Sequence, residues 1–417
     1  MKKFSITKKV SLLLAAFAVC VMAACISMPV KAAPGPLTLS NDPAVWDSRY
    51  PTTNYIFLES KTNLGQVIEL KYSTTDQNVN SGSTVFAAGT SLNGKYYYLV
   101  NQKFSPAQTV YLKYENADVL VGVTAPNAIT SLSQTNATAN SVTVSWSPVS
   151  GADGYYVYTV GANGSLTLKG SVSGGSTTSY AVGGLTQNGV YAIGISPFKS
   201  NGKGFTQYWS PSGKTSFRTT PGKISGVKLA ASSGYAKKYQ IAWSQSGASY
   251  ADGFEIMITN KSGKKITTAT EESYLSHIFT NAKLRSQPWK VKVRAYVKMD
   301  NGTKAYGAWS SEKVVVPNAY IKSIKQTSKY SSNIKITWGK VTGAQNYTIY
   351  RSTSKNGKYK KVKTVKGTSY TTSQSANGKW YYYYVKANGV KVGKKKYNST
   401  SLAQPDWYGY KLTKKYY

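Results

Sequence analysis

The feature that most constrains this chain is a pattern that occurs three times, at intervals of about 95 residues. Each copy opens at a proline and carries a tryptophan about 20 residues later. The prolines are Pro126, Pro221 and Pro317, and the tryptophans are Trp146, Trp243 and Trp338. A regular period of this length indicates tandem copies of one small domain. Arrays of this kind connect, display or bind far more often than they catalyse.

Composition predicts that these copies are built from strands. The 417 residues include 35 tyrosines and 36 glycines, and residues that favour strands are far commoner than signals for helices. Asn-Gly pairs such as Asn201-Gly202 and Asn388-Gly389 separate alternating runs, which is a hairpin signal. Within each copy the strand that ends at the tryptophan alternates, so one of its faces packs on a core. We therefore expect an all-β protein whose tryptophans fill two-sheet sandwiches.

The three copies resemble the fibronectin type III family. The resemblance rests on the proline, the tryptophan, a later aromatic-x-aliphatic pair in each copy, and a corner motif in the first copy. The pairs are Tyr155/Val157, Phe254/Ile256 and Tyr347/Ile349, and the corner runs from Leu185 to Tyr191. The second copy departs from the motif, with Lys283 and Trp289 at the corner positions, and the third has Ser375 in place of the leucine. The resemblance implies tandem immunoglobulin-like β-sandwiches, arranged as beads on a string, that act as spacers or binding units of bacterial surface proteins.

We expect six segments along the chain. They are a signal peptide (1–32), an N-terminal β domain of unknown family (33–125), three fibronectin type III-like domains (126–219, 220–317 and 318–404), and an aromatic and basic tail (405–417). The N-terminal domain has five or more strand-like runs, which suit a small sandwich. The tail is interpreted either as a binding segment or as a last strand or frayed end.

The first 32 residues have the pattern of an export signal. Lysines come first, and the stretch from Val10 to Val30 is nearly uncharged, followed by a small-residue cleavage site at Ala32. A retained membrane anchor and a lipid attached at Cys25 remain alternatives. Both cysteines, Cys20 and Cys25, lie in this segment, so the exported chain has no disulfide to stabilise it. We expect a secreted protein that associates with the cell surface.

Positive charge rises along the chain. The formal net charge is +37, and by segment it is −1 for 33–125, +4 for 126–219, +9 for 220–317 and +20 for 318–417. The last segment has 21 basic residues and one acid. Solubility alone does not require such an imbalance, although lysine does protect exposed strand edges. The charge therefore indicates a polyanionic partner for the third copy.

We expect the ligand-binding residues in this third copy. The lysines are Lys358, Lys360, Lys361, Lys363, Lys379, Lys394, Lys395 and Lys396, and the aromatic residues are Tyr382, Tyr384, Trp407 and Tyr408. In the run from Tyr381 to Tyr384, two side chains face the core and two face outward. The outward pair could stack on sugar rings, or could simply cover the sheet.

Catalytic chemistry has little support in the sequence. The one histidine, His277, cannot make a multi-histidine metal site, and the exported chain has no thiol. Glu271 and Glu272 are adjacent on a strand and point to opposite faces, which prevents them from acting as a pair. The acids of the N-terminal segment worth naming are Asp42, Asp47, Glu59 and Glu69. We expect no enzyme, no catalytic residue, no cofactor and no metal.

The leading hypothesis is a non-catalytic surface, adhesion or scaffold protein whose basic C-terminal domains bind an anionic cell-wall polymer or glycan by electrostatics. Other surface proteins are possible partners, and export argues against nucleic acid. The first alternative is a protein that binds neutral polysaccharide through exposed tyrosines and tryptophans. The second is an enzyme with its site in residues 33–125.

Overall fold

The structure of the protein is a computed structural model that describes residues 37–40, 52, 54–234, 236–328, 330–374, 378–402 and 406–413, without the side chains of 214 and 215. The expected signal peptide, Cys25, Asp42 and Asp47 lie outside these residues. The chain divides into two compact units. The first contains the N-terminal sheet and most of the first repeat, and the second contains the other two repeats with two short segments of the first, Ala137–Asn140 and Leu185–Gly189.

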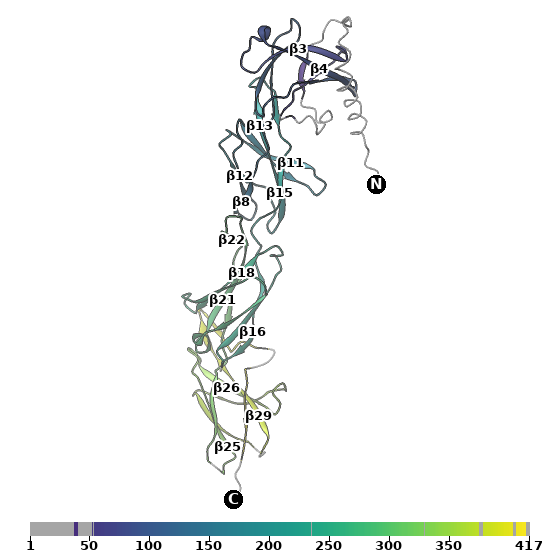
Figure 1. Ribbon diagram of the computed structural model, residues 1–417. Coiled ribbons are helices and arrows are strands. Elements are labelled where there is room, and N and C mark those ends of the chain that lie inside the picture. The colour runs from purple at the N-terminus through teal and green to yellow at the C-terminus, as the bar shows by residue number, and fades with distance from the viewer. Residues whose placement is uncertain are drawn as a thin grey trace. The chain divides into compact units, whose positions relative to one another are not determined.

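The N-terminal part is one antiparallel sheet of seven strands, in the order β1-β2-β5-β4-β3-β6-β7. Figure 1 labels β3 and β4 in it. The strands are β1 (Thr38–Ser40), β2 (Phe57–Ser60), β3 (Val67–Ser73), β4 (Ser83–Leu92), β5 (Lys95–Val100), β6 (Thr109–Lys113) and β7 (Leu120–Val123), with a short 3-10 turn η2 (Val79–Ser81). One continuous ladder joins all seven strands, and its two edge strands, β1 and β7, also contact each other. The sheet therefore curves around a single core and does not divide into the two separate sheets of the expected sandwich.

The length of β4 explains this arrangement. Its first part pairs with β3 and its second part with β5, so a single long strand carries the ladder from one half of the sheet to the other. At Gly89 the chain passes close to the buried ring of Tyr98, and a Cβ there would lie 2.7 Å from a ring carbon. Glycine is what allows β4 and this ring to approach so closely.

The first repeat is a two-sheet sandwich. One sheet has the order β12-β9-β8, and the other has the order β11-β10-β13-β14 with β15 also paired to β13. The strands are β8 (Leu132–Ala137), β9 (Val142–Trp146), β10 (Gly154–Val160), β11 (Leu166–Ser173), β12 (Ser179–Val182), β13 (Val190–Ser200), β14 (Thr206–Tyr208) and β15 (Ser212–Arg218).

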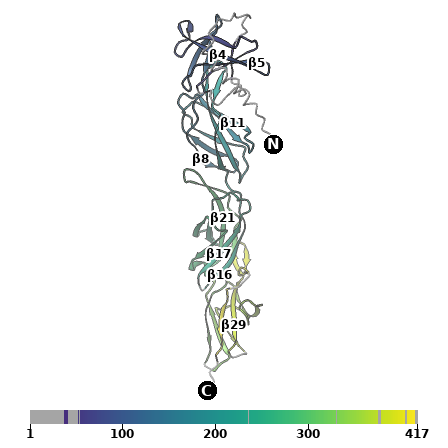
Figure 2. The same ribbon diagram turned by 45° about the vertical axis from the view of Figure 1, so that its right-hand side comes forward.

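The second repeat has the same strand order. Its smaller sheet is β16-β17-β20, and its larger sheet is β19-β18-β21-β22 with β23 also paired to β21; Figure 2 labels β16, β17 and β21. The strands are β16 (Ser225–Ser233), β17 (Lys238–Ser244), β18 (Gly253–Asn260), β19 (Lys265–Glu271), β20 (Ser276–Thr280), β21 (Trp289–Lys298), β22 (Lys304–Tyr306) and β23 (Lys313–Val315), with a 3-10 turn η3 (Ala282–Arg285).

The third repeat follows this plan with a change at its end. Its sheets are β24-β25-β28 and β27-β26-β29-β32, and β30 and β31 form a separate hairpin. The strands are β24 (Ile321–Gln326), β25 (Asn333–Trp338), β26 (Asn346–Ser352), β27 (Lys360–Val365), β28 (Ser369–Ser373), β29 (Trp380–Asn388), β30 (Val390–Val392), β31 (Lys395–Tyr397) and β32 (Tyr408–Lys411).

The border expected after residue 404 is wrong. Tyr408–Lys411 forms β32, which pairs with β29 as the last strand of the sandwich, and Leu412 is buried in the core of the repeat. The tail is thus part of the third sandwich, because Tyr408 and Tyr410 pack against that core. The other expected borders, after residues 125, 219 and 317, lie in connections between the sheets.

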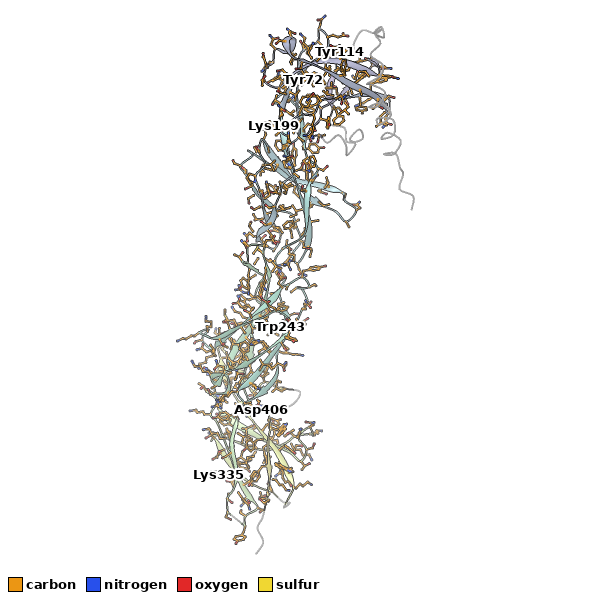
Figure 3. All side chains as sticks on the ribbon, in the orientation of Figure 1. Tyr72, Tyr114, Lys199, Trp243, Lys335 and Asp406 are labelled. Carbon is orange, nitrogen blue, oxygen red and sulfur yellow. The ribbon has the colours of Figure 1, made fainter. Side chains whose placement is uncertain are left out.

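All three repeats build their cores around the same contact. Trp146, Trp243 and Trp338 are buried, and each contacts the first aromatic residue of the next strand with the two rings inclined to one another. The centroid separations are 5.2 Å for Trp146–Tyr155, 5.4 Å for Trp243–Phe254 and 5.8 Å for Trp338–Tyr347, and the interplanar angles are 63°, 56° and 60°. Figure 3 labels Trp243 in the second repeat. Tilted and edge-to-face contacts of this kind are favourable, and the predicted all-β class of tandem sandwiches is confirmed.

The corner of the second repeat uses a different residue for the same purpose. Trp289 is fully buried, and its Nε1–H donates to the carbonyl oxygen of Leu284 at 3.0 Å. Leu284, and not Lys283, supplies the buried leucine. The tryptophan therefore ties the corner to the backbone through its indole N–H, a tie that the resemblance assigns to a tyrosine hydroxyl.

Candidate functional site

The outer face of the larger sheet in the third repeat gathers aromatic side chains. Along β29, Tyr381 and Tyr383 are buried in the core. Trp380, Tyr382 and Tyr384 alternate with them and so lie on the opposite face of the sheet. The predicted orientation of the tyrosine run, two side chains inward and two outward, is confirmed by this burial pattern.

Three tyrosines form a stack over one half of this face. Tyr350 on β26 lies directly across from Tyr384 on β29, and their rings are parallel within 6° at a centroid distance of 4.8 Å. Tyr359, from the loop before β27, covers Tyr384 at 5.0 Å. Its hydroxyl donates to the carbonyl oxygen of Lys355 at 3.0 Å, which holds the loop over the sheet.

Two tryptophans and a tyrosine cover the other half. The rings of Trp380 and Tyr382 are nearly parallel, at 21° and a centroid distance of 6.4 Å. Trp407, just before β32, meets Tyr382 edge-on at 5.1 Å. Trp380 is 49% exposed, whereas Tyr382 and Trp407 are half-buried. We call the six residues Tyr350, Tyr359, Trp380, Tyr382, Tyr384 and Trp407 the aromatic face.

Strand register places two lysines on this same side of the sheet. Lys361 lies opposite Tyr350, and Lys411 lies opposite Trp380. Residues directly opposite one another on neighbouring strands project from the same face. Both lysines are exposed, so their ammonium groups remain available to solvent or to a ligand.

Two further lysines contact the rings. The Nζ of Lys386 lies 5.5 Å from the centroid of the Tyr350 ring, and the Nζ of Lys355 lies 5.7 Å from that of Trp407. These distances are within the range of cation–π attraction. We call Lys355, Lys361, Lys386 and Lys411 the lysine rim.

The predicted lysine ligands fall into separate groups. Lys358, Lys360, Lys361 and Lys363 are exposed on the edge strand β27 and in the loop before it, and Lys379 is exposed just before β29. Lys394, Lys395 and Lys396 are exposed in the hairpin of β30 and β31. That hairpin follows the far end of the nine-residue β29, about 26 Å along the strand from Trp380. The structure therefore does not bring all the predicted lysines together.

The predicted aromatic ligands need two corrections. Tyr384 is only 8% exposed because the rings of Tyr350 and Tyr359 cover it. Tyr408 packs against the core of the repeat, on the other side of the sheet from Trp407. Tyr382 and Trp407 do lie on the aromatic face. The sequence analysis missed Trp380, although it stands two residues before Tyr382 and alternation along the strand places it on the same face.

Burial raises the pKa of two phenols of this face, those of Tyr359 and Tyr384. Desolvation, followed by the nearby phenol of Tyr350, raises the pKa of Tyr384 to about 12. Desolvation, with the neighbouring Tyr384 and Tyr382, raises the pKa of Tyr359 to about 12. At neutral pH these hydroxyls are therefore uncharged hydrogen-bond donors, and the positive charge of the face comes from its lysines alone.

The lysines of the third repeat have almost no carboxylate to pair with. The only acidic residue between 318 and 417 is Asp406, and it accepts a hydrogen bond from the backbone N–H of Gly234 in the second repeat. Desolvation raises the pKa of Asp406 to about 6, and the bond from Gly234 opposes this shift. Among the described residues, no lysine of this repeat forms an ion pair.

The corresponding face of the second repeat is internally paired. Arg294 lies 4.4 Å from the ring centroid of Trp309 and forms an ion pair with Glu255 at 2.6 Å. Lys292 lies 4.7 Å from the same ring. The aromatic ring is thus covered by cations of its own chain, and one of those cations is neutralised by a carboxylate.

The corresponding face of the first repeat has rings without a comparable charge. Tyr156 lies 4.6 Å from Phe198 and 6.1 Å from Tyr208. The nearby Lys199 forms an ion pair with Asp153 at 2.8 Å. Of the three sandwiches, the third therefore combines exposed rings with lysines that have no carboxylate partner.

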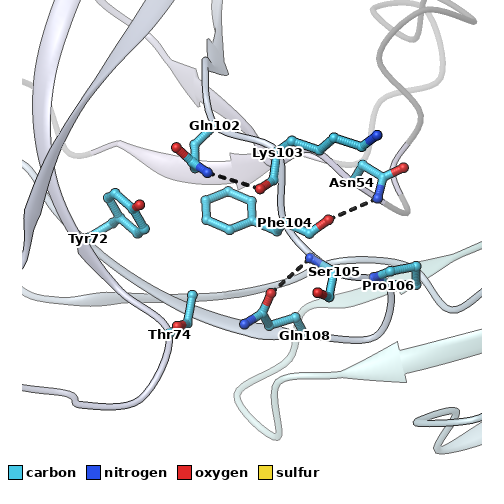
Figure 4. A pocket seen from close by; sticks show the side chains of 9 residues that line it. All are labelled: Asn54, Tyr72, Thr74, Gln102, Lys103, Phe104, Ser105, Pro106 and Gln108. Carbon is cyan, nitrogen blue, oxygen red and sulfur yellow. Dashed lines mark hydrogen bonds between the residues drawn. The ribbon is translucent and has the colours of Figure 1, made fainter.

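A shallow depression of about 480 Å³ lies in the N-terminal sheet domain (Figure 4), and Asn54, Tyr72, Thr74, Gln102, Lys103, Phe104, Ser105, Pro106 and Gln108 line it. The amides there hold the loop in place. Asn54 donates to the carbonyl oxygen of Phe104 at 2.9 Å, and the Oε1 of Gln108 accepts from the N–H of Ser105 at 2.9 Å. Because these groups stabilise the loop and no acid lines the depression, we do not assign it a function.

The groups considered for catalysis are kept apart or already paired. Glu59 is on β2 and Glu69 on β3, and two strands, β5 and β4, separate them in the ladder. His277 contacts Glu271 at 3.2 Å on the second repeat. Within the described part of the chain, no group of three or more His, Cys, Asp or Glu could hold a metal ion.

In the described ranges, no helix has the length and apolar character needed to cross a bilayer.

Comparison with known proteins identifies the fold of the first repeat. Residues 127–213 match the model of the family described as Fibronectin type III domain. No curated protein matches the chain. Similar solved structures include the chicken CNTN1 FN1-FN3 domains (16% identity over 70% of this chain and 100% of that one, TM-score 0.23). They also include a two-domain fibronectin type III segment of chicken tenascin (15% identity over 45% of this chain and 99% of that one, TM-score 0.23). A third is the central fibronectin-III array of RIM-binding protein (18% identity over 60% of this chain and 89% of that one, TM-score 0.19). At TM-scores this low we draw nothing further from these structures.

The family match and the fold together define the class of protein. The first repeat matches the fibronectin type III family, and the other two repeats have its strand order and the same tryptophan contact. Such repeats indicate a non-catalytic scaffold or adhesion protein, and they are typical of extracellular proteins. Fold alone does not assign a ligand.

Proposed function

We propose that this protein is an exported, non-catalytic surface protein whose third repeat binds an anionic polymer of the cell surface, such as a teichoic acid-like polymer or an acidic glycan. The observation that carries the proposal is the edge strand β27. Lys360, Lys361 and Lys363 on this strand are all exposed, and the repeat has no carboxylate side chain other than Asp406.

The arrangement goes beyond what protection of a strand edge needs. One lysine on an edge strand is enough to discourage pairing with another chain. Three lysines within four residues repel one another, which costs stability unless an external anion neutralises them. A polymer with regularly spaced negative charges would relieve this repulsion at several lysines at once.

The test is binding of the full chain to purified anionic cell-wall polymer over a series of salt concentrations. The Debye length falls from about 8 Å at physiological ionic strength to about 3 Å at 1 M, so we expect affinity to fall steeply. The test variant changes Lys360, Lys361 and Lys363 to Gln.

A matched control removes the same charge from the other sheet. This sheet also has three exposed lysines, which are Lys322 and Lys325 on β24 and Lys335 on β25. Figure 3 labels Lys335. We expect the β27 variant to weaken binding much more than the triple change to Gln at these positions. An affinity that resists salt and is unaffected by the β27 variant would overturn the proposal.

A second candidate function is binding of a neutral polysaccharide. The observation that favours it is the exposure of Trp380, a large apolar ring on a polar surface. Binding of this kind should persist at high salt and should not respond to the β27 variant, which separates it from the first proposal.

A further inference from the structure

We infer that the polymer bound by the third repeat is an acidic polysaccharide, whose sugar rings stack on the aromatic face while its carboxylates pair with the lysine rim. The inference rests on the proposed function and narrows it from anionic polymers in general to those built of sugar rings. It follows from the position of the exposed rings and the lysines on one face of one sheet.

The first step concerns the rings. Trp380 and Tyr382 present a nearly continuous surface, because their planes differ by only 21°. Trp407 stands edge-on beside Tyr382. The face of an aromatic ring is electron-rich and apolar, so it attracts the slightly positive C–H groups on the flat side of a pyranose ring. Polymers without rings, such as polyphosphate, have no such surface to offer.

The second step concerns the lysines. Lysines are exposed on both sheets of the repeat, including Lys322, Lys325 and Lys335 on the smaller sheet. Exposed positive charge is therefore not confined to the larger sheet, although it is most closely spaced on β27. The larger sheet differs in that Lys355 and Lys386 lie within 6 Å of ring centroids. A ligand that meets these ammonium groups must also meet the rings.

The third step concerns size. The sheet has four strands in the order β27-β26-β29-β32, so the face spans about 14 Å across the strands. Lys361 on β27 and Lys411 on β32 lie near the two edges of this span. The dimensions suit a short stretch of a polymer, with charges contacted at both sides and rings in the middle.

Comparison with the second repeat shows why we place the polysaccharide on the third. In the second repeat, Arg294 and Lys292 already cover the ring of Trp309, and Glu255 pairs with Arg294. The cations and the ring of this face therefore already have partners within the same repeat. In the third repeat, Trp380 remains 49% exposed and no carboxylate neutralises the rim.

The experiment measures the affinity of the full chain for three probes: polygalacturonate as the acidic polysaccharide, dextran as the neutral one, and polyphosphate as a polyanion without rings. The test variant is Trp380→Ala. The control is Tyr274→Ala, which removes a 70% exposed ring from the second repeat. Both positions are exposed, so both variants should fold, and thermal unfolding checks this.

We expect polygalacturonate to bind more tightly than either other probe. We expect Trp380→Ala to lower the ratio of polygalacturonate to polyphosphate affinity about five- to tenfold, and Tyr274→Ala to leave that ratio unchanged. An unchanged ratio in Trp380→Ala overturns the inference, and so does dextran binding as tight as that of polygalacturonate. Failure of the proposed function has a different signature: neither polyanion binds, or the β27 variant binds both as the parent chain does.

Discussion

The indole N–H groups give a sharp test of what stabilises these sandwiches. Trp289 and Trp338 are equally buried, at 0% and 2% exposure. The Nε1–H of Trp289 donates to the carbonyl oxygen of Leu284. The Nε1 of Trp338 is buried with no hydrogen-bond partner among the described residues. Replacing each tryptophan by Phe removes the same atoms, and of the two changes Trp289→Phe is the one that breaks an indole hydrogen bond.

The magnitude follows from that difference. Both changes lose similar packing volume, and this shared cost cancels in the comparison. Trp289→Phe also breaks a hydrogen bond and leaves the Leu284 carbonyl without it, which costs about 1–3 kcal/mol. Trp338→Phe breaks no such bond. We therefore expect Trp289→Phe to cost about 1–3 kcal/mol more, which is about 5- to 150-fold in an opening equilibrium.

Native-state hydrogen exchange of the full chain is the suitable assay, because it reports the opening of each repeat separately. Peptides from β21 and β29 are compared with the same peptides of the parent chain. Trp146→Phe is the matched control, since the Nε1 of Trp146 also lacks a partner among the described residues, and its cost in the first repeat should resemble that of Trp338→Phe. The reasoning fails if Trp338→Phe loses as much protection as Trp289→Phe.

Two further predictions concern the junction and the N-terminal sheet. Because the pKa of Asp406 is raised to about 6 in the folded chain, the folded state binds more protons than the unfolded state, so stability is lost as pH rises through about 6. The opening free energy around β32, taken from hydrogen exchange after correction for the intrinsic pH dependence of amide exchange, should rise between about pH 7 and about pH 5, and Asp406→Asn should remove this rise. In Gly89→Ala the new Cβ would displace the ring of Tyr98, whose hydroxyl accepts from the N–H of Leu64 at 2.8 Å. We expect a loss of about 1–3 kcal/mol in urea unfolding, whereas Gly183→Ala, where nothing lies within 4 Å, should cost far less; equal losses would contradict the steric argument.

The sequence predicts the sandwich cores well because their determinants are local. Alternation up to Trp146 or Trp338, followed by an aromatic residue about ten positions later, fixes which side chains meet between the two sheets. The orientation of the tyrosine run in β29 follows from the same rule. Strand period needs no knowledge of the partner strand.

What could not be predicted depends on pairing between distant segments. The N-terminal strands were found, but nothing in their alternation distinguishes one seven-stranded sheet from two smaller ones. The last strand β32 is separated from β31 by ten residues, which made it look like a tail. Tyr384 was expected to be exposed because its cover, Tyr359, comes from a loop whose path the sequence does not specify.

The three sandwiches show how one scaffold acquires different surfaces. The inward positions are constrained by the shared tryptophan contact, so they change little from copy to copy. The outward positions of the larger sheet are free to vary, and they do. Tyr156 packs among uncharged rings, Trp309 is covered by its own cations, and Trp380 is exposed beside unpaired lysines. The net charge of the repeats rises from +4 to +9 to +20, and the excess of basic residues over carboxylates is by far the largest in the last. An external anion with an apolar face is the partner that this remaining surface fits.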